Sequence, residues 1–142
     1  MFTSFSFIPL RVRDVDETID FYTNLLGFYL LRKYVMRPGE LPCAYVGLDG
    51  VLLELFPAGS AGGSESASFG LNVTDLDAAL AHLREKGVAV VREQFTPRTF
   101  WGRQAGILDP SGHRISLREW RAPDGPQFMD WQPDQEGVSR LA

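Results

Sequence analysis

Residues 12–19 read VRDVDETI, and residues 73–80 read VTDLDAAL. Both stretches follow the pattern Val-x-Asp-apolar-Asp-x-x-apolar, and they begin 61 positions apart. Two pairs of glycines repeat at almost the same spacing: Gly27 with Gly87, 60 positions apart, and Gly50 with Gly112, 62 positions apart. Three landmarks at a nearly constant offset indicate that the chain contains two copies of one structural unit.

Each copy predicts the same order of elements. The apolar runs at 5–12 and 68–73 are typical of strands. Asp14 and Asp75 then supply helix N-caps, and the apolar residues that follow recur at helical spacing. Gly27 and Gly87 suit the left-handed residue that closes a helix. Three further strands are expected in each copy, at 28–35, 43–48 and 51–56, and at 88–93, 103–108 and 113–119, with hairpin turns at Asp49-Gly50 and Ser111-Gly112.

The repeated unit is therefore βαβββ, and the fold class is α+β. We expect one domain over 1–142, with modules at about 5–57 and 67–121, a flexible linker at 58–66 within PAGSAGGSES, and a tail at 122–142. The tail retains Phe128, Met129 and Trp131, which either attach it to the body or leave it loose.

Composition narrows the function classes. The net charge of −4 comes with no basic stripe, so a nucleic-acid partner is not expected. No apolar run is long enough to span a membrane, and the N-terminus lacks a signal-peptide pattern. The single cysteine, Cys43, excludes an intrachain disulfide and fits a half-buried strand position. We expect a cytoplasmic protein.

Strand alternation sorts the side chains into two faces. Ile8, Leu10, Val12, Val51, Leu53 and Leu55 are expected on the helix side of the first module. Phe69, Leu71, Val73, His113, Ile115 and Leu117 are expected there in the second. The opposite faces then carry Phe7, Arg11, Glu54, Phe56, Ser68, Asn72, Arg114, Ser116 and Arg118. Such a face is either simply solvated or, if the sheet curls, a pocket with a few fixed polar groups.

Four stretches carry a family resemblance: LRVRDVDETIDFYTNLLGF (10–28), LLELF (52–56), FGLNVTDLDAALAHLREKG (69–87) and WGRQAGILDPSGHRISL (101–117). They resemble the vicinal oxygen chelate superfamily, which includes glyoxalase I, bleomycin-resistance proteins and extradiol dioxygenases. The resemblance implies that the two modules form a U-shaped mixed-sheet cleft with helices on the outer face, in a homodimer.

Metal-dependent members of that superfamily place a ligand at four equivalent strand positions. By position these fall on Phe7, Glu54, Ser68 and Ser116. One carboxylate with two neutral hydroxyls and a phenyl ring is a poor site for zinc, nickel or iron. His82 is expected at a helix surface and His113 on the helix side of its strand, so neither replaces the missing ligands. We therefore expect no metal and no other cofactor.

The leading hypothesis is a glyoxalase/bleomycin-resistance-like protein that binds a planar or aromatic small molecule in the sheet cleft. Phe100 and Trp101, in TPRTFWGRQ, offer flat surfaces for stacking. The candidate ligand-binding residues are Phe7, Arg11, Glu54, Phe56, Ser68, Asn72, Phe100, Trp101, Arg114, Ser116 and Arg118. Glu54 would accept a hydrogen bond from a ligand amine or pair with Arg114 or Arg118. The arginines favour a carboxylate or phenolate, so the sequence leaves the ligand's charge open.

Two enzymatic alternatives remain. A metal-free isomerase or lyase would use Glu54 as general base, with a pKa raised by Phe7 and Phe56 and with Arg11 or Arg118 steadying an oxyanion. A metal-dependent glyoxalase or dioxygenase with degenerate ligands is the less favoured alternative, because the donor set is weak. Beyond a second copy of the chain and a small molecule, no partner is expected.

Overall fold

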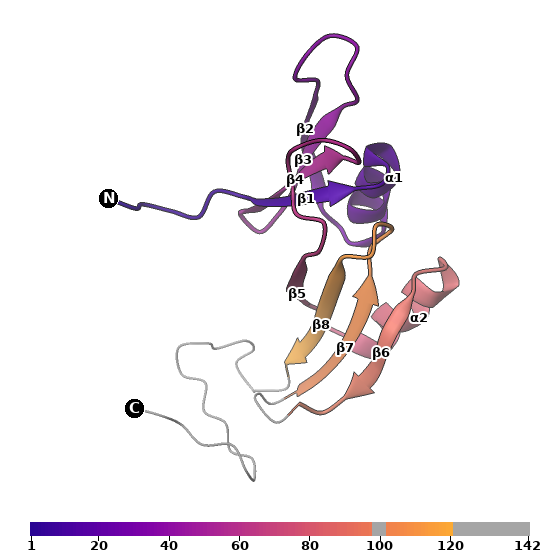
Figure 1. The fold of residues 1–142 in the computed structure, drawn as a ribbon. Coiled ribbons are helices and arrows are strands. Elements are labelled where there is room, and N and C mark those ends of the chain that lie inside the picture. The colour runs from indigo at the N-terminus through magenta and orange to yellow at the C-terminus, as the bar shows by residue number, and fades with distance from the viewer. Residues whose placement is uncertain (98–101, 121–142) are drawn as a thin grey trace. The chain divides into compact units, whose positions relative to one another are not determined.

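The computed structural model describes residues 1–97 and 102–120, and the chain divides into two compact units (Figure 1). The first unit is Met1–Ala67 together with Asp109–His113. The second unit is Ser68–Leu108 together with the chain from Arg114 onward. No helix in the described ranges combines the length and apolar character that crossing a membrane requires.

The first unit holds a four-stranded mixed sheet and a helix. Strand β1 runs parallel to β4, and β4–β3 and β3–β2 are antiparallel, which gives the order β1-β4-β3-β2. Helix α1 continues directly into a π-helical turn over Phe21–Leu25. The elements are β1 Ile8–Val12, α1 Val15–Asp20, β2 Tyr29–Tyr34, β3 Cys43–Leu48 and β4 Val51–Pro57.

The second unit repeats this plan. Strand β5 is parallel to β8, and the order is β5-β8-β7-β6. Its elements are β5 Ser68–Asn72, α2 Leu76–Glu85, β6 Val90–Phe95, β7 Gly102–Leu108 and β8 Arg114–Trp120. The predicted βαβββ repeat and the α+β class are confirmed. Strand β1 begins at Ile8, so Phe7 precedes the strand in which the sequence pattern placed it.

Both helices start and stop at the predicted residues. The side chain of Asp14 accepts a hydrogen bond from the backbone N–H of Glu17 at 2.9 Å, and Asp75 accepts one from Ala78 at 3.0 Å. Both N-caps are therefore filled as expected. At the other end of α2, Val88 N–H donates to the Leu83 carbonyl around Gly87, whose φ is +79°. This is the helix-closing pattern for which glycine is favoured.

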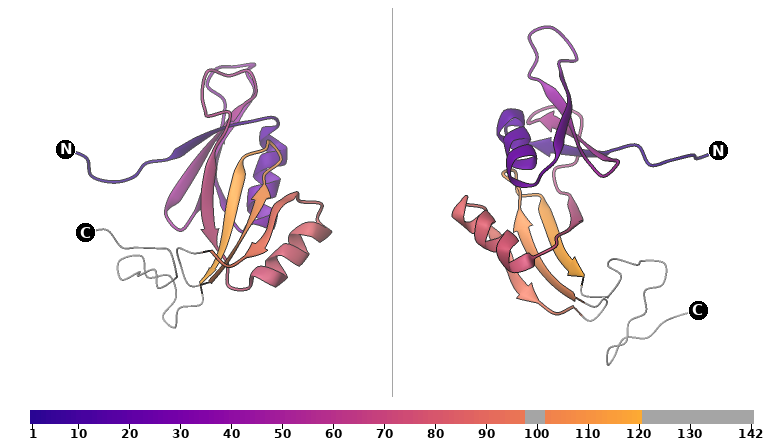
Figure 2. Two further views of the ribbon diagram at one scale, coloured as in Figure 1. Left: turned by 60° about the horizontal axis from the view of Figure 1, so that its bottom comes forward. Right: turned by 180° about the vertical axis from the view of Figure 1, so that it is seen from behind.

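Each unit buries its own apolar core between helix and sheet. Figure 2 shows α2 lying across one face of its sheet, where it contacts β6, β7 and β8. The first core contains Leu10, Val12, Val46, Leu53 and Leu55, and the second contains Leu76, Leu80, Ile107, Ile115 and Leu117. Each of these side chains contributes roughly 1.5–3 kcal/mol through burial. Val51, expected in the first core, is instead 43% exposed.

The two hairpin turns differ from each other. Asp49 and Gly50 both have positive φ, at 50° and 77°, which is the two-residue turn expected from the sequence. The counterpart between β7 and β8 is a longer loop, Asp109–His113, in which Gly112 alone has positive φ. Ser111-Gly112 therefore lies in the hairpin connection, as expected, but the connection is a wider loop that the Asp109 side chain organises.

Asp109 connects that loop to the helix of the first unit. One of its carboxylate oxygens accepts hydrogen bonds from the backbone N–H groups of Ser111 and His113, each at 2.9 Å. The other accepts the Tyr22 hydroxyl at 2.8 Å. Asp109 is 4% exposed and Tyr22 is fully buried, so the DPSGH motif forms part of the first unit's interior.

The segment predicted to be a flexible linker is bonded to the free edge of β1. Arg11 N–H donates to the Ser64 carbonyl at 2.8 Å, and Ser64 N–H donates to Pro9 at 3.3 Å. Gly63 permits this approach, because a Cβ on it would lie 2.6 Å from the backbone nitrogen of Arg11. The edge of β1 is thereby covered in part by the chain itself.

Replacing Asp109 with alanine is expected to lower the free energy of unfolding by about 3 kcal/mol, because two buried donors and one part-buried donor lose their acceptor. Asp109→Asn retains an amide oxygen for the two backbone donors, so its loss should be clearly smaller. Urea unfolding followed by circular dichroism measures both. A loss below about 0.5 kcal/mol for Asp109→Ala would contradict this role.

Candidate functional site

Glu54 lies at the centre of the helix-free face of the first sheet. In the register, Glu54 on β4 pairs with Pro9 on β1 and with Tyr45 on β3, so the three residues form one row across the sheet. Tyr34 on β2 pairs with Cys43 on β3, next along the same face. Glu54 is only 5% exposed, whereas the alternation pattern had placed it on an open face.

Two tyrosines cover this carboxyl group. The Tyr34 hydroxyl donates a hydrogen bond to Glu54 Oε1. The Tyr34 ring stacks on the Tyr45 ring, with centroids 5.9 Å apart and planes 23° apart. Phe7 meets the edge of Tyr45 at 6.2 Å and 89°. The sequence interpretation found Phe7 and Glu54 but missed both tyrosines, although Tyr45 sits at an alternating strand position that the same reasoning could have sorted.

The environment favours the neutral form of both phenols. Burial raises the pKa of Tyr34, and the hydrogen bond to Glu54 and its negative charge raise it further. Burial and the same carboxylate also raise the pKa of Tyr45. The pKa of the Cys43 thiol is raised mainly by burial. The phenols therefore remain hydrogen-bond donors at neutral pH, and Cys43 is a buried thiol rather than a nucleophile.

Arg11 and Phe56 face the segment that follows β4. Arg11 Nε donates to the Gly62 carbonyl at 3.0 Å, and its Nη1 forms an ion pair with Glu65 at 2.7 Å. A Cβ on Gly62 would lie 2.5 Å from the Phe56 ring, which is 9% exposed. Both side chains thus bind the chain's own linker, which the sequence pattern did not indicate.

A hollow of about 610 Å³ opens beside this part of the first unit. It lies between the β2–β3 loop and the segment after β4, and its lining includes Met36, Arg37, Leu41, Cys43 and Phe56. Cys43 and Phe56 are buried beneath the more exposed Met36 and Leu41. The hollow is not visible in the sequence because the two loops that form it carry no periodic pattern.

The helix-free face of the second sheet holds the remaining candidates. Ser68 pairs with Arg114, Gly70 with Ser116, and Asn72 with Arg118 across the parallel strands β5 and β8. Trp120, two residues beyond Arg118 on β8, donates from its indole Nε1 to Asn72 Oδ1 at 2.9 Å. The register therefore places Ser68, Asn72, Arg114, Ser116 and Arg118 together on one surface. Phe100 and Trp101 lie outside the described residues.

The family's four ligand positions do not fit a divalent cation. Phe7 supplies no donor, and Glu54 is covered by Tyr34. Ser68 and Ser116 are neutral hydroxyls in the second unit. Across residues 1–97 and 102–120, His, Cys, Asp and Glu side chains form no group of three that could hold a metal ion. Zinc, nickel and iron sites require several imidazole, thiolate or carboxylate ligands.

Neither histidine is placed to replace the missing ligands. His113 is fully buried, its Nδ1 accepts the Ala67 N–H at 3.0 Å, and its Nε2 donates to the Arg11 carbonyl at 2.7 Å. Both ring nitrogens are thus used by the backbone of the first unit. His82 is exposed on α2, as predicted.

Comparison with known proteins identifies the family. Residues 4–117 match the model of the Glyoxalase/Bleomycin resistance protein/Dioxygenase superfamily. The chain belongs to this superfamily.

Members of the superfamily with different names resemble the chain to a similar degree. A Synechocystis protein named "Probable lactoylglutathione lyase" is 31% identical over 116 residues, covering 76% of this chain and 88% of the relative. TnmS3, titled an antibiotic binding protein from Streptomyces sp. CB03234, is 30% identical. Its crystal structure has a TM-score of 0.62 and covers 83% of this chain and 98% of its own. Both a lyase and a binding protein are therefore among its relatives.

The tyrosine contacts predict an unusual titration. The pKa is raised for Tyr22, Tyr34 and Tyr45, three of the four tyrosines. Near pH 10.5, roughly the ordinary range for tyrosine, phenolate absorbance at 295 nm should be well below that of the unfolded chain. Above about pH 10 the unfolded chain releases protons that the folded chain keeps, so the free energy of unfolding should fall as pH rises.

Tyr34→Phe provides the matched comparison, because it removes one of these groups and should make the fall shallower. Phenolate absorbance in the folded protein equal to that of the unfolded chain near pH 10.5 would contradict the described environment.

Proposed function

We propose that this protein is a metal-free small-molecule-binding protein, which holds a planar aromatic ligand on a helix-free sheet face. The observation that carries the proposal is the state of Glu54. At the one family ligand position that retains an acid, the carboxyl group is 5% exposed and accepts a hydrogen bond from Tyr34. A metal ion at Oε1 would have to displace that hydroxyl, and the described residues include no group of three His, Cys, Asp or Glu side chains that could hold it.

The aromatic side chains around Glu54 supply the flat surface that a planar ligand requires. The Tyr34–Tyr45 stack and the Phe7 ring form an aromatic wall in the first unit. In the second unit, Asn72 accepts a hydrogen bond from the Trp120 indole on its own sheet. Aromatic side chains of this kind provide large apolar area with fixed geometry. TnmS3, at 30% identity, is a relative whose title states antibiotic binding, and it supports a binding function for this chain.

A metal-free lyase or isomerase is the second candidate. The relatives named lactoylglutathione lyase favour an enzyme, and the Glu54–Tyr34 hydrogen bond joins a carboxyl group to a proton donor. However, a general base must reach its substrate within about 3 Å. Glu54 is buried beneath the tyrosines, which are its partners in place of the expected Phe7 and Phe56. This geometry favours a positioning role for Glu54, which holds the aromatic wall in place.

Thermal unfolding with a panel of planar aromatic compounds tests the proposal. A compound present at about one hundred times its Kd should add roughly 2.7 kcal/mol to the free energy of unfolding and raise Tm by several degrees. Tyr45→Ala removes a ring from the wall and should weaken binding about tenfold, a change typical of losing one aromatic contact. Phe2→Ala, which removes a fully exposed ring, should leave binding unchanged.

The same compounds, together with lactoylglutathione, are then tested for turnover by wild type and Glu54→Gln. Binding without turnover supports the proposal. Turnover of a bound compound that falls at least about a hundredfold in Glu54→Gln, with binding retained, would instead establish Glu54 as a general base.

A further inference from the structure

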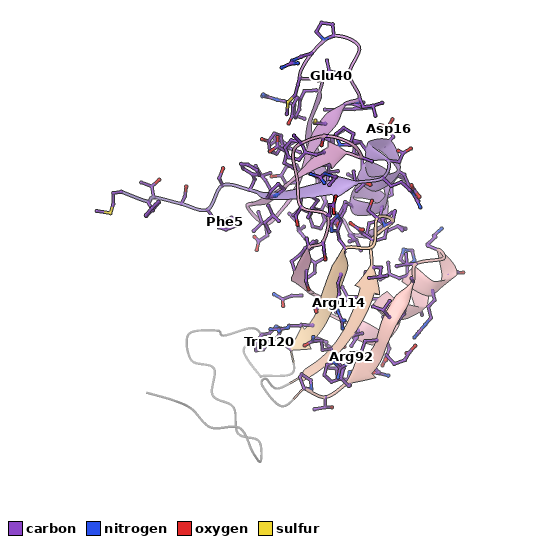
Figure 3. All side chains as sticks on the ribbon, viewed as in Figure 1. Phe5, Asp16, Glu40, Arg92, Arg114 and Trp120 are labelled. Carbon is purple, nitrogen blue, oxygen red and sulfur yellow. The ribbon has the colours of Figure 1, made fainter. Side chains whose placement is uncertain are left out.

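The helix-free face of the second sheet gathers three arginines, one of which the sequence pattern did not indicate. Arg114 and Arg118 lie on β8, and Arg92 lies on β6. Arg92 pairs with Gly106 on β7, which in turn pairs with Ser116 on β8. The pairing of β6 is interrupted on both sides of Arg92, so simple alternation could not assign it a face. We call Arg92, Arg114 and Arg118 the arginine face; the first two are labelled in Figure 3.

Gly106 allows the side chains of Arg92 and Arg114 to lie close to the same stretch of backbone. A Cβ on Gly106 would lie 3.3 Å from Arg114 Nη2 and 3.4 Å from the Cβ of Arg92. The side chains of Arg92 and Arg114 therefore border the same bare stretch of backbone from neighbouring strands. Figure 3 labels both of them on this sheet, together with Trp120 at the end of β8. An anion above Gly106 would be within reach of either guanidinium.

Arg92 and Arg114 differ from the ion-paired arginines of this unit. The unit's other described arginines form ion pairs: Arg84 with Glu93, and Arg103 with Asp77 and Glu119. Arg92 and Arg114, in contrast, have no carboxylate partner among the described residues. Two neighbouring cations without counter-ions repel each other, and a bound anion would remove that repulsion. The net charge of the protein is −4, so Arg92 and Arg114 form a local excess of positive charge on a chain that is negative as a whole.

Flat and polar groups accompany the cations. The Arg92 guanidinium lies 3.6 Å from the centroid of the Phe95 ring, a stacking contact that holds it in place. Gln104 pairs with both Phe95 and Arg118 in the register, and Ser116 lies beside Gly106. Their amide and hydroxyl groups can donate hydrogen bonds to an oxyanion. Trp120 offers an apolar surface at the end of the same strand.

We propose that the arginine face binds the anionic oxygen group, a carboxylate or an ionised phenol, of a planar aromatic ligand. Arg92 and Arg114 are the residues that select the charge, while the neighbouring rings contact the aromatic part. This inference rests on the proposed function and adds to it the ligand class. It also separates these arginines from Arg11. Arg11 belongs to the other unit, forms an ion pair with Glu65, and is not expected to bind the anion.

Three probes of the same shape test the inference: anthracene-2-carboxylate, its neutral carboxamide, and the cationic 2-aminomethylanthracene. Isothermal titration calorimetry should give a Kd for the carboxylate at least about ten times lower than for the carboxamide, with the amine weakest. Raising the salt concentration from about 0.05 M to about 0.3 M should narrow the gap, because added ions screen exposed charges.

Arg92→Gln and Arg114→Gln should each weaken carboxylate binding about tenfold and change carboxamide binding less than about twofold. Arg114→Lys keeps the charge and should retain part of the preference. Arg84→Gln is the matched control, because it removes the same charge from an arginine that is paired with Glu93. It should leave all three affinities unchanged.

The outcomes separate this inference from the function on which it rests. Equal affinity for the three probes, or a carboxylate preference that survives Arg92→Gln and Arg114→Gln, overturns the arginine face while leaving planar-ligand binding in place. If none of the three probes binds, the proposed function is overturned and, with it, this inference.

Discussion

Burying a carboxyl group in the middle of a β-sheet costs several kcal/mol unless hydrogen-bond donors surround it. Glu54 occupies such a position on β4, and the donor that it uses is the Tyr34 hydroxyl from β2. Because β2 and β4 are separated by β3, this contact ties three strands together across the helix-free face. It also fixes the Tyr34 ring on Tyr45, so the polar group and the aromatic wall beside it are one arrangement.

The two repeats have kept one scaffold while their open faces have become chemically different. In the first unit, the face is aromatic around a single covered acid, and Arg11 is bonded to Gly62 and Glu65. In the second unit, the position equivalent to Glu54 is Ser116, and arginines flank it. A symmetric metal site would require matching ligands from both repeats. The two faces therefore no longer supply matching ligands, and each has its own chemistry.

The sequence predicted the scaffold well because its signals are local. The N-caps Asp14 and Asp75 and the closing glycine Gly87 act within a few residues of their positions, and all three have the expected roles. The site was predicted less completely. Tyr34 reaches Glu54 across 20 positions of sequence, and Arg92 sits between two interruptions of strand pairing. Such contacts depend on register, which a single strand's alternation does not specify.

The linker at 58–66 is a second place where the sequence was an incomplete guide, because its composition predicted flexibility and the structure shows specific contacts. PAGSAGGSES has the composition of a flexible connection, yet Ser64 pairs with β1 and Gly62 covers Phe56. Small residues are required there because another backbone and a ring approach closely, and composition alone does not separate close approach from flexibility.

Elemental analysis of untagged protein, followed by titration with zinc and nickel, tests the central claim most directly. If Tyr34 and Tyr45 have taken the place of a metal at Glu54, the protein contains no stoichiometric metal. Neither cation should then raise Tm, and Glu54→Gln should not change that result. One metal ion per chain, or a rise in Tm with zinc or nickel that disappears in Glu54→Gln, would contradict this account and indicate a metal centre at Glu54.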